Sequence, residues 1–180
     1  MPIYKKVVDL CLGSSDLSFY RFIADRTQAD PVVRFRDRST AYEKMVEQLV
    51  LASIQSPTIV SVLADNYSTP DEILFEEELR AGVNRRLNRL AVLNVVRLDS
   101  KSTDGLQIVD LLTSAAVFEF RANAGLASAT SDKGALAKYV RDVLGVDSLL
   151  SGWRQGPHSV QLYGHGRWDG SSESGDLVVH

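Results

Sequence analysis

The chain has 180 residues and a formal net charge of −3; 44% of its side chains are hydrophobic and 24% are charged. This composition is typical of one globular domain, and 12 glycines and 5 prolines are too few for a fibrous or low-complexity protein. The weak negative charge argues against a protein that coats nucleic acid through bulk charge. No apolar run reaches the ~18 residues of a membrane helix, and the N-terminus lacks the apolar stretch of a secretion signal, so we expect a cytoplasmic protein.

Two hydrophobic periodicities alternate along the chain and predict helices and strands in turn. Apolar residues spaced by three and four predict amphipathic helices, whereas short runs of β-branched and aromatic residues predict strands. In chain order, we expect a helix over 4–12, a strand over 17–24, a helix over 41–54, a strand over 58–64, a helix from about 68 to 89, a strand over 91–98, helices over 106–122 and 133–144, and a short strand over 159–163.

Turn and capping residues mark several boundaries of these elements. Gly13 suits a left-handed stop of the first helix, and Pro57 ends the second one. Either Ser39 or Thr40 is available to cap that second helix. Residues 26–40, which precede it, are polar and predict a loop.

The order of the elements predicts an α/β fold. Strands alternate with helices, which is typical of a layered mixed sheet with helices on both faces. The strand over 58–64 is almost entirely apolar, as expected for a strand covered on both sides. We expect residues 1–163 to form this single domain and residues 164–180, rich in glycine, serine and charge, to be a disordered tail.

Several common chemistries are excluded by residue type. The single cysteine, Cys11, cannot form an internal disulfide or a thiolate metal cage, and between two leucines it is expected in the core. The three histidines all lie in the C-terminal region without acidic partners at the spacing of a zinc site. The chain also lacks a phosphate loop, a dinucleotide fingerprint and a nucleophile elbow.

Aspartates follow three of the predicted strands: Asp25, Asp65 and Asp99. In open α/β sheets, ligands bind beyond the carboxyl ends of the strands, which makes these residues candidates for a functional site. An aspartate after a strand is equally a common turn and cap residue. Both interpretations apply to each of the three.

Asp110 lies on the helix predicted over 106–122. At helical spacing it shares a stripe with Leu106 and Val117, and we expect that stripe to pack on the sheet. A buried carboxylate without a partner would cost several kcal/mol, so it must meet a cation, a donor or a metal ion. Gln107, three residues earlier, can donate to it. The alternative is a core aspartate satisfied by a nearby serine or asparagine.

Convergence of Asp65 and Asp110 would favour a divalent cation. Two carboxylates within ~5 Å repel each other, and a hard cation removes that conflict. Magnesium prefers carboxylate and water oxygens and commonly activates water against a phosphodiester. We therefore expect Mg²⁺, or Mn²⁺ in its place, with Asp65 and Asp110 as ligands.

Three segments together resemble a bacterial family catalogued as domain of unknown function 3800. They are Val62-Leu63-Ala64-Asp65-Asn66, Val96-Arg97-Leu98-Asp99-Ser100-Lys101 and Gly105-Leu106-Gln107-Ile108-Val109-Asp110-Leu111-Leu112. The family signature is aspartate-serine-lysine followed by a helix with glutamine-x-x-aspartate, and the chain is similar to it in both parts. The resemblance covers about residues 17–121.

This resemblance implies a ribonuclease H-like fold and a metal-dependent nuclease acting on nucleic-acid phosphodiesters, that is, a Mg²⁺-dependent hydrolase. Asp65 would be the carboxylate that closes the fourth strand of the fold, and Asp110 the acid of its last helix. Ser100 and Lys101 would contact phosphate or brace the site. Glu43 or Glu47 is a further carboxylate candidate, although a solvated face is the simpler interpretation of both.

The chain departs from the family at its N-terminus. The family opens with a central strand that carries a first acidic motif, and nothing similar precedes Tyr4. The expected fold is therefore N-terminally incomplete, and this form of the chain is expected to be weakly active or inactive. An uncovered apolar strand over 58–64 would pair with another chain, either a second copy or a partner strand that completes the sheet.

Arginines suggest a second function. Arg85 and Arg86 belong to a cluster near one predicted helix end and are candidates for nucleic-acid binding through phosphate. The alternative function is therefore a non-catalytic nucleic-acid-binding or interaction module on the same scaffold. A solvated helix face balanced by nearby glutamates explains the same arginines without any partner.

Overall fold

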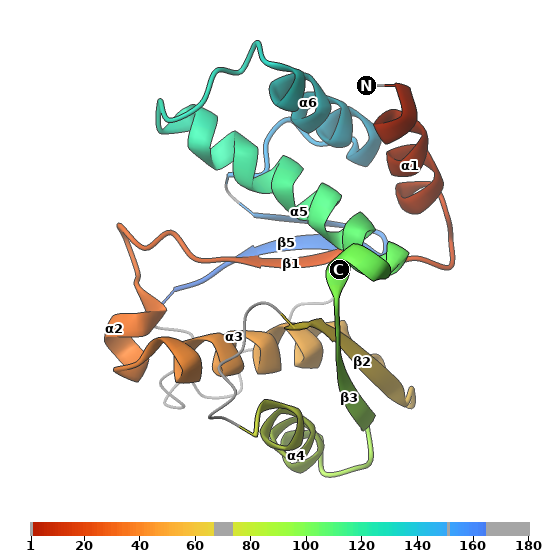
Figure 1. The fold of residues 1–180 in the computed structure, drawn as a ribbon, viewed down its shortest axis with the longest axis vertical. Helices are drawn as coiled ribbons and strands as arrows, with labels where there is room; N and C mark the ends of the chain where they lie inside the picture. Colours follow the sequence, from red (N-terminus) through yellow and green to blue (C-terminus); the bar gives the residue numbers. More distant parts are fainter. Residues whose placement is uncertain (1, 67–73, 151, 165–180) are drawn as a thin grey trace.

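The computed structural model describes residues 2–66, 74–150 and 152–164. The protein is a mixed α/β structure, which confirms the expected α/β class, and helices predominate in it (Figure 1). Its helices and strands are, in chain order, α1 (Pro2–Leu12), β1 (Tyr20–Ile23), α2 (Pro31–Phe35), α3 (Arg38–Ser53), β2 (Val60–Asp65), α4 (Phe75–Leu87), β3 (Val92–Leu98), the 3-10 turn η2 (Ser100–Ser102), α5 (Asp104–Asn123), α6 (Asp132–Leu144), β4 (Trp153–Gln155) and β5 (His158–Leu162).

The described strands form two sheets and not the single layered sheet that was expected. In the first sheet, β5 lies between β1, which is parallel to it, and β4, which is antiparallel. The second sheet is the parallel pair of β2 and β3. Pairing between strands is set by tertiary contacts, which hydrophobic periodicity does not contain.

The first sheet belongs to a region that we call the β1–β5 region, made of α1, α5, α6, β1, β4 and β5. Figure 1 shows the three helices on one side of β1 and β5 and helix α3 on the other side. Leu112, Ala116, Val140, Val160 and Leu149 are almost fully buried in its core. Burial of apolar side chains from both layers holds this region together.

The second sheet belongs to the β2–β3 region, made of α3, α4, β2 and β3. Phe75, Leu79 and Val83 of α4 are buried against Val92 and Val95 of β3. Because side chains alternate along a strand, the other face of the pair carries a different set of residues.

That other face is open to solvent. Leu63 of β2 pairs in register with Val96 of β3, and these side chains are 53% and 37% exposed. Ile59 and Leu93 are also exposed. The expectation of a strand covered on both faces is therefore wrong for the described residues, because α3 and α4 pack on one face only.

Capping explains how the predicted loop over 26–40 differs from the structure. Asp30 caps α2, with Pro31 in its first turn, and Asp37 caps α3. Oδ1 of Asp37 accepts hydrogen bonds from the backbone N–H groups of Ser39 and Thr40, at 2.8 Å each. The helix therefore begins three residues earlier than expected, and neither Ser39 nor Thr40 is its cap.

Most other boundaries agree with the prediction to within a few residues. The strand β4 was not expected; it forms a hairpin with β5 across Gly156, whose φ of +54° suits a residue without a side chain. The expected helix start at 68–72 and nearly all of the expected disordered tail lie outside the described residues. Along the described parts of the chain, no helix combines the length and the apolar character that a bilayer-spanning helix needs.

Candidate functional site

Asp65 lies at the carboxyl end of β2, as expected. It is partly buried and pairs in register with Leu98 at the end of β3. Tyr42 of α3 lies within electrostatic reach: burial raises the pKa of the Tyr42 hydroxyl, and the negative charge of Asp65 raises it further. The ring of Tyr42 packs against Phe75 with centroids 5.7 Å apart, which fixes its position.

Asp110 is exposed on α5, which corrects the expectation that its stripe packs on the sheet. The residues that α5 buries are Leu112, Ala115, Ala116 and Glu119. Val117, on the expected stripe, is 37% exposed. Helix α5 carries apolar residues on two faces. The face that packs in the core is the one with Leu112, Ala115 and Ala116, and not the one with Asp110.

Asp110 and Asp65 face different surroundings. Asp110 lines a cavity between α1, α5 and α6, and Asp65 is not among the residues that line it. The two elements that carry the aspartates nevertheless come near each other, although α5 and β2 contribute to separate core clusters. In Figure 1, β3 is followed closely by the start of α5, with only the short turn η2 between them.

Gln107 has a different acceptor from the one expected. Its Nε2 donates to the backbone carbonyl oxygen of Lys101 at 3.0 Å, and not to Asp110. This hydrogen bond ties the turn η2 to the first turns of α5. Gln107 therefore helps to hold the segment that carries Ser100 and Lys101.

The aspartates that follow β1 and β3 act as turn residues. Oδ1 of Asp25 accepts hydrogen bonds from the hydroxyl and the backbone N–H of Thr27, and these bonds lower the pKa of Asp25. Oδ1 of Asp99 accepts from the backbone N–H of Lys101 at 2.9 Å. For Asp25 and Asp99, the structure thus shows the turn and cap interpretation.

The side chains of the η2 turn are placed at the same end of the β2–β3 sheet as Asp65. Lys101 is exposed and Ser100 is partly buried, both directly after β3. An exposed ammonium group at this position is accessible to an anionic ligand.

The arginines at the end of α4 are exposed. Arg85 and Arg86 lie in its last turn, where positive charge also suits the helix dipole. Nη1 of Arg86 lies 3.5 Å from Oε1 of Glu47, so the charge of Arg86 is partly neutralised by this ion pair. Arg89 donates to the carbonyl oxygen of Thr58 at 2.8 Å and links α4 to the start of β2.

Glu43 and Glu47 are buried, which corrects the expectation of a solvated face. They are 9% and 3% exposed, and Nζ of Lys44 contacts both carboxylates at 2.9 and 3.1 Å. Glu47 is further neutralised by Arg86 from α4. A cation from a distant helix leaves no signal in the local sequence, so the burial of Glu47 could not be predicted.

Sequence reasoning also missed Glu119. This residue is 8% exposed on α5; its Oε1 accepts from the hydroxyl of Ser148 at 2.8 Å and from the backbone N–H of Leu149 at 3.2 Å. Its Oε2 forms an ion pair with Arg141 at 3.1 Å. Its spacing of three, four and seven residues from Ala116, Ala115 and Leu112 was the signal that could have placed it in the core.

The described residues do not complete a two-metal site. Among them, no group of three or more histidine, cysteine, aspartate or glutamate side chains is arranged to hold a metal ion. Magnesium is often held by one or two carboxylates together with water and substrate phosphate. Asp65 and Asp110 therefore suit Mg²⁺ as donors by their chemistry, but their number is short of what paired-metal hydrolysis requires.

Comparison of the chain with models of protein families, with curated proteins and with solved structures gives no match.

Proposed function

We propose that this chain is a ribonuclease H-like domain of a Mg²⁺-dependent nuclease that acts on nucleic-acid phosphodiesters. The observation that carries the proposal is the arrangement at the end of the β2–β3 sheet. Asp65 ends β2, Ser100 and Lys101 follow β3, and the helix that carries Asp110 begins next and lies near β2. Ligand sites of parallel sheets lie beyond the carboxyl ends of their strands.

The roles of the residues follow from their chemistry. Asp65 and Asp110 would hold the ion, which supplies Lewis acidity toward a phosphodiester when it is bound. Lys101 would attract the phosphate, and Ser100 would donate a hydrogen bond to it. Gln107 positions this segment through its bond to the Lys101 carbonyl.

A further strand would complete the site. Within the described residues, β2 has β3 on one edge and no strand on the other. The segment of β2 from Val60 to Ala64 has no charge or proline that would discourage pairing on that edge. We propose that a second copy of the chain or a strand from a partner pairs there and contributes the carboxylate that the described residues lack.

Magnesium titration of the folded, ¹⁵N-labelled chain near pH 7 tests the metal site. We expect saturable shifts of the NMR amide signals of residues next to Asp65 and next to Asp110, because both carboxylates would hold the ion. Asp65→Asn should remove this response to Mg²⁺.

The second ligand and a control complete the experiment. Asp110→Asn weakens the response to Mg²⁺. Asp142→Asn, which removes an exposed carboxylate paired with Lys138, leaves the titration unchanged. A response that is the same in Asp65→Asn and Asp110→Asn as in the unmodified chain would refute the metal site.

One observation favours a second candidate, the non-catalytic nucleic-acid-binding module. Among the described residues, no three histidine, cysteine, aspartate or glutamate side chains are grouped so that they could hold a metal ion. In contrast, Arg80, Arg85 and Arg86 are exposed on α4. Binding through these arginines would weaken as salt is added and persist in the presence of a chelator. Loss of binding on chelation of Mg²⁺ would instead support the nuclease.

A further inference from the structure

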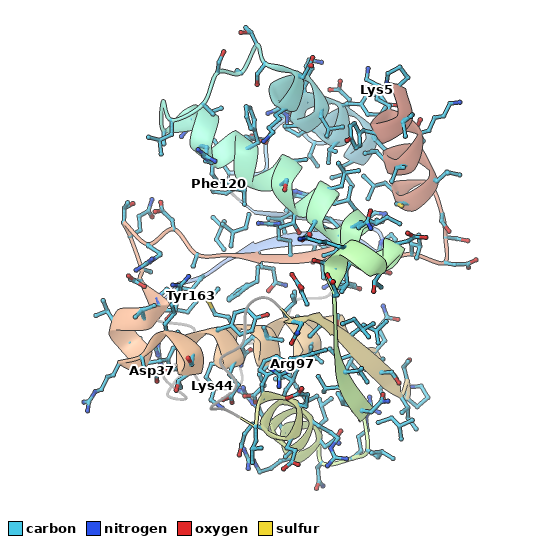
Figure 2. All side chains as sticks on the ribbon, in the orientation of Figure 1. Lys5, Asp37, Lys44, Arg97, Phe120 and Tyr163 are labelled. Atoms are coloured by element: carbon cyan, nitrogen blue, oxygen red, sulfur yellow. The ribbon has the colours of Figure 1, made fainter. Side chains whose placement is uncertain are left out.

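A cavity of about 700 Å³ lies between α1, α5 and α6. It exists because α1 and α5 both pack on α6 and leave a space between them. Helix α1, whose Lys5 is labelled in Figure 2, is fixed on α6 by polar contacts as well as by its buried residues. The hydroxyl of Tyr139 donates to Oδ1 of Asp9 at 2.7 Å, and Nζ of Lys5 lies 4.5 Å from the centroid of the Tyr139 ring.

The walls of the cavity are apolar. Ile3 and Tyr4 of α1 face it from one side, Leu111 and Phe118 of α5 from another, and Leu136 from α6. Ile3 is 74% exposed and Tyr4 is 52% exposed, although both belong to a helix that is docked on the domain. The volume lies within the range of ~300–1,000 Å³ that is common for small-molecule sites.

The polar groups of the cavity are mainly hydrogen-bond acceptors on α5. Asp104, Gln107, Asp110 and Ser114 succeed one another at spacings of three and four residues, so they form one row along the helix. Gln107 uses its Nε2 to bind the Lys101 carbonyl, which leaves its carbonyl oxygen as an acceptor. Lys133 of α6 is the one basic residue among the described lining residues, against two carboxylates.

We propose that this cavity binds a small hydrophobic amine. The hydrocarbon part of the ligand lies between α1 and α5, and its ammonium group lies at the acidic row, next to Asp104 and Asp110. A neutral ligand would leave the two carboxylates with Lys133 as their one cation among the described lining residues, and an anionic ligand would be repelled by them. The cavity shares Asp110 with the proposed metal site but not Asp65, so the two proposals are separated by changes at Asp104 and Ser114, which line the cavity and are not proposed metal ligands.

Three eight-carbon probes separate the charge of the ligand from its apolar body. In titrations of the ¹⁵N-labelled chain followed by NMR, we expect n-octylammonium to bind in a saturable way and to shift the amide signals of α1, α5 and α6. We expect n-octanol to bind roughly fivefold more weakly and n-octyl sulfate more weakly still, in keeping with one partly exposed charge contact. All three probes are used below their micelle concentrations.

Two variants outside the proposed metal site test the two parts of the cavity. Asp104→Asn should reduce the preference for n-octylammonium over n-octanol about threefold and leave n-octanol binding unchanged. Ser114→Leu should abolish the binding of both probes, because its side chain fills the cavity from an exposed position on α5. Neither residue is buried, so the fold is expected to tolerate both changes.

Matched controls are Asp132→Asn, which removes an acid from the first turn of α6, and Asn123→Leu, which adds an exposed leucine at the end of α5. Neither residue lines the cavity, and we expect both variants to bind like the unmodified chain. Equal affinities for n-octylammonium and n-octyl sulfate, the absence of saturable binding, or undiminished binding to Ser114→Leu would each overturn the proposal.

Discussion

The two regions of the molecule differ in how many faces of their sheet are covered by helices. In the β1–β5 region, helices lie on both sides of the sheet formed by β1, β5 and β4 (Figure 1). In the β2–β3 region, α3 and α4 pack on one face of a two-stranded sheet, while Leu63 and Val96 are exposed on the other. Two strands alone give marginal stability in water, so the packing on α3 and α4 supplies most of the stability of this sheet.

Buried carboxylates show the same contrast. Glu119 in the β1–β5 region has two hydrogen-bond donors and one arginine, all supplied by the segment from Arg141 to Leu149. Glu47 in the β2–β3 region depends on Lys44 and Arg86, whose side chains are 34% and 50% exposed. A buried carboxylate is thus held by two hydrogen-bond donors and one partly buried arginine in one region, and by two partly solvated cations in the other.

The largest expected effect is that of Glu119→Ala. The substitution removes the acceptor of the Ser148 hydroxyl and of the Leu149 N–H, and it leaves Arg141 without its counter-ion. We expect the free energy of unfolding to fall by about 3 kcal/mol, as measured by urea denaturation. Arg86→Ala, which removes one of the two cations of Glu47 in the β2–β3 region, should cost less because Arg86 is half exposed and Lys44 still neutralises Glu47. Equal losses in the two variants would contradict the contrast drawn between the regions.

A glycine in a helix of each region provides the second comparison. A Cβ at Gly134 of α6 would overlap the carbonyl oxygen of Ala129, which is backbone and cannot move freely. A Cβ at Gly82 of α4 would lie 3.2 Å from Cδ of Glu47, a side chain that can shift slightly. We expect Gly134→Ala to lower the melting temperature through a loss of about 2 kcal/mol. For Gly82→Ala, the gain in helix propensity of about 1 kcal/mol offsets the displacement of Glu47, and the net change is near zero.

The third prediction concerns the open face of the β2–β3 sheet. Leu63→Lys places a charge beside the edge of β2 that has no strand partner among the described residues, and we expect it to reduce self-association of the chain without lowering the stability of the monomer. Sedimentation velocity over a range of concentrations measures this effect. Val33→Lys is the control, because Val33 is 75% exposed on α2. Identical association of Leu63→Lys and the unmodified chain would show that this face is not an interface.

Local patterns in the sequence were enough to predict most helices and strands. The helix α6 begins one residue earlier than expected, and the strand β3 begins one residue later than expected. Apolar periodicity and end signals such as Pro57 are properties of a short segment, so they can be read without knowledge of the fold.

Features that depend on contacts between distant segments could not be predicted. Helix α5 has apolar residues on two faces, and periodicity alone does not say that Leu112 packs in the core while Val109 is exposed. The exposure of Asp110 follows from that choice. The placement of Asp65 was predictable because it depends only on where a strand ends, whereas the acceptor of Gln107 depends on the path of the preceding turn.

The smallest expected effect is the pH dependence of the ion pair between Glu76 of α4 and Arg97 of β3. Burial alone would raise the pKa of Glu76, but the hydrogen bond from Arg97 outweighs it and holds the pKa below the usual value of 4.5. The pair therefore stabilises the fold at neutral pH, and this contribution is lost as the pH falls through the lowered pKa of Glu76. We expect Glu76→Gln to cost about 0.5 kcal/mol near pH 7 and to make the decline of stability below pH ~4.5 less steep. Glu77→Gln, at an exposed position of the same helix turn, should leave the pH profile unchanged. If both variants gave the same profile, the ion pair would contribute nothing to holding α4 on β3, and apolar packing together with the hydrogen bonds between Asn84 and the backbone of Val92 would link the helix to this strand.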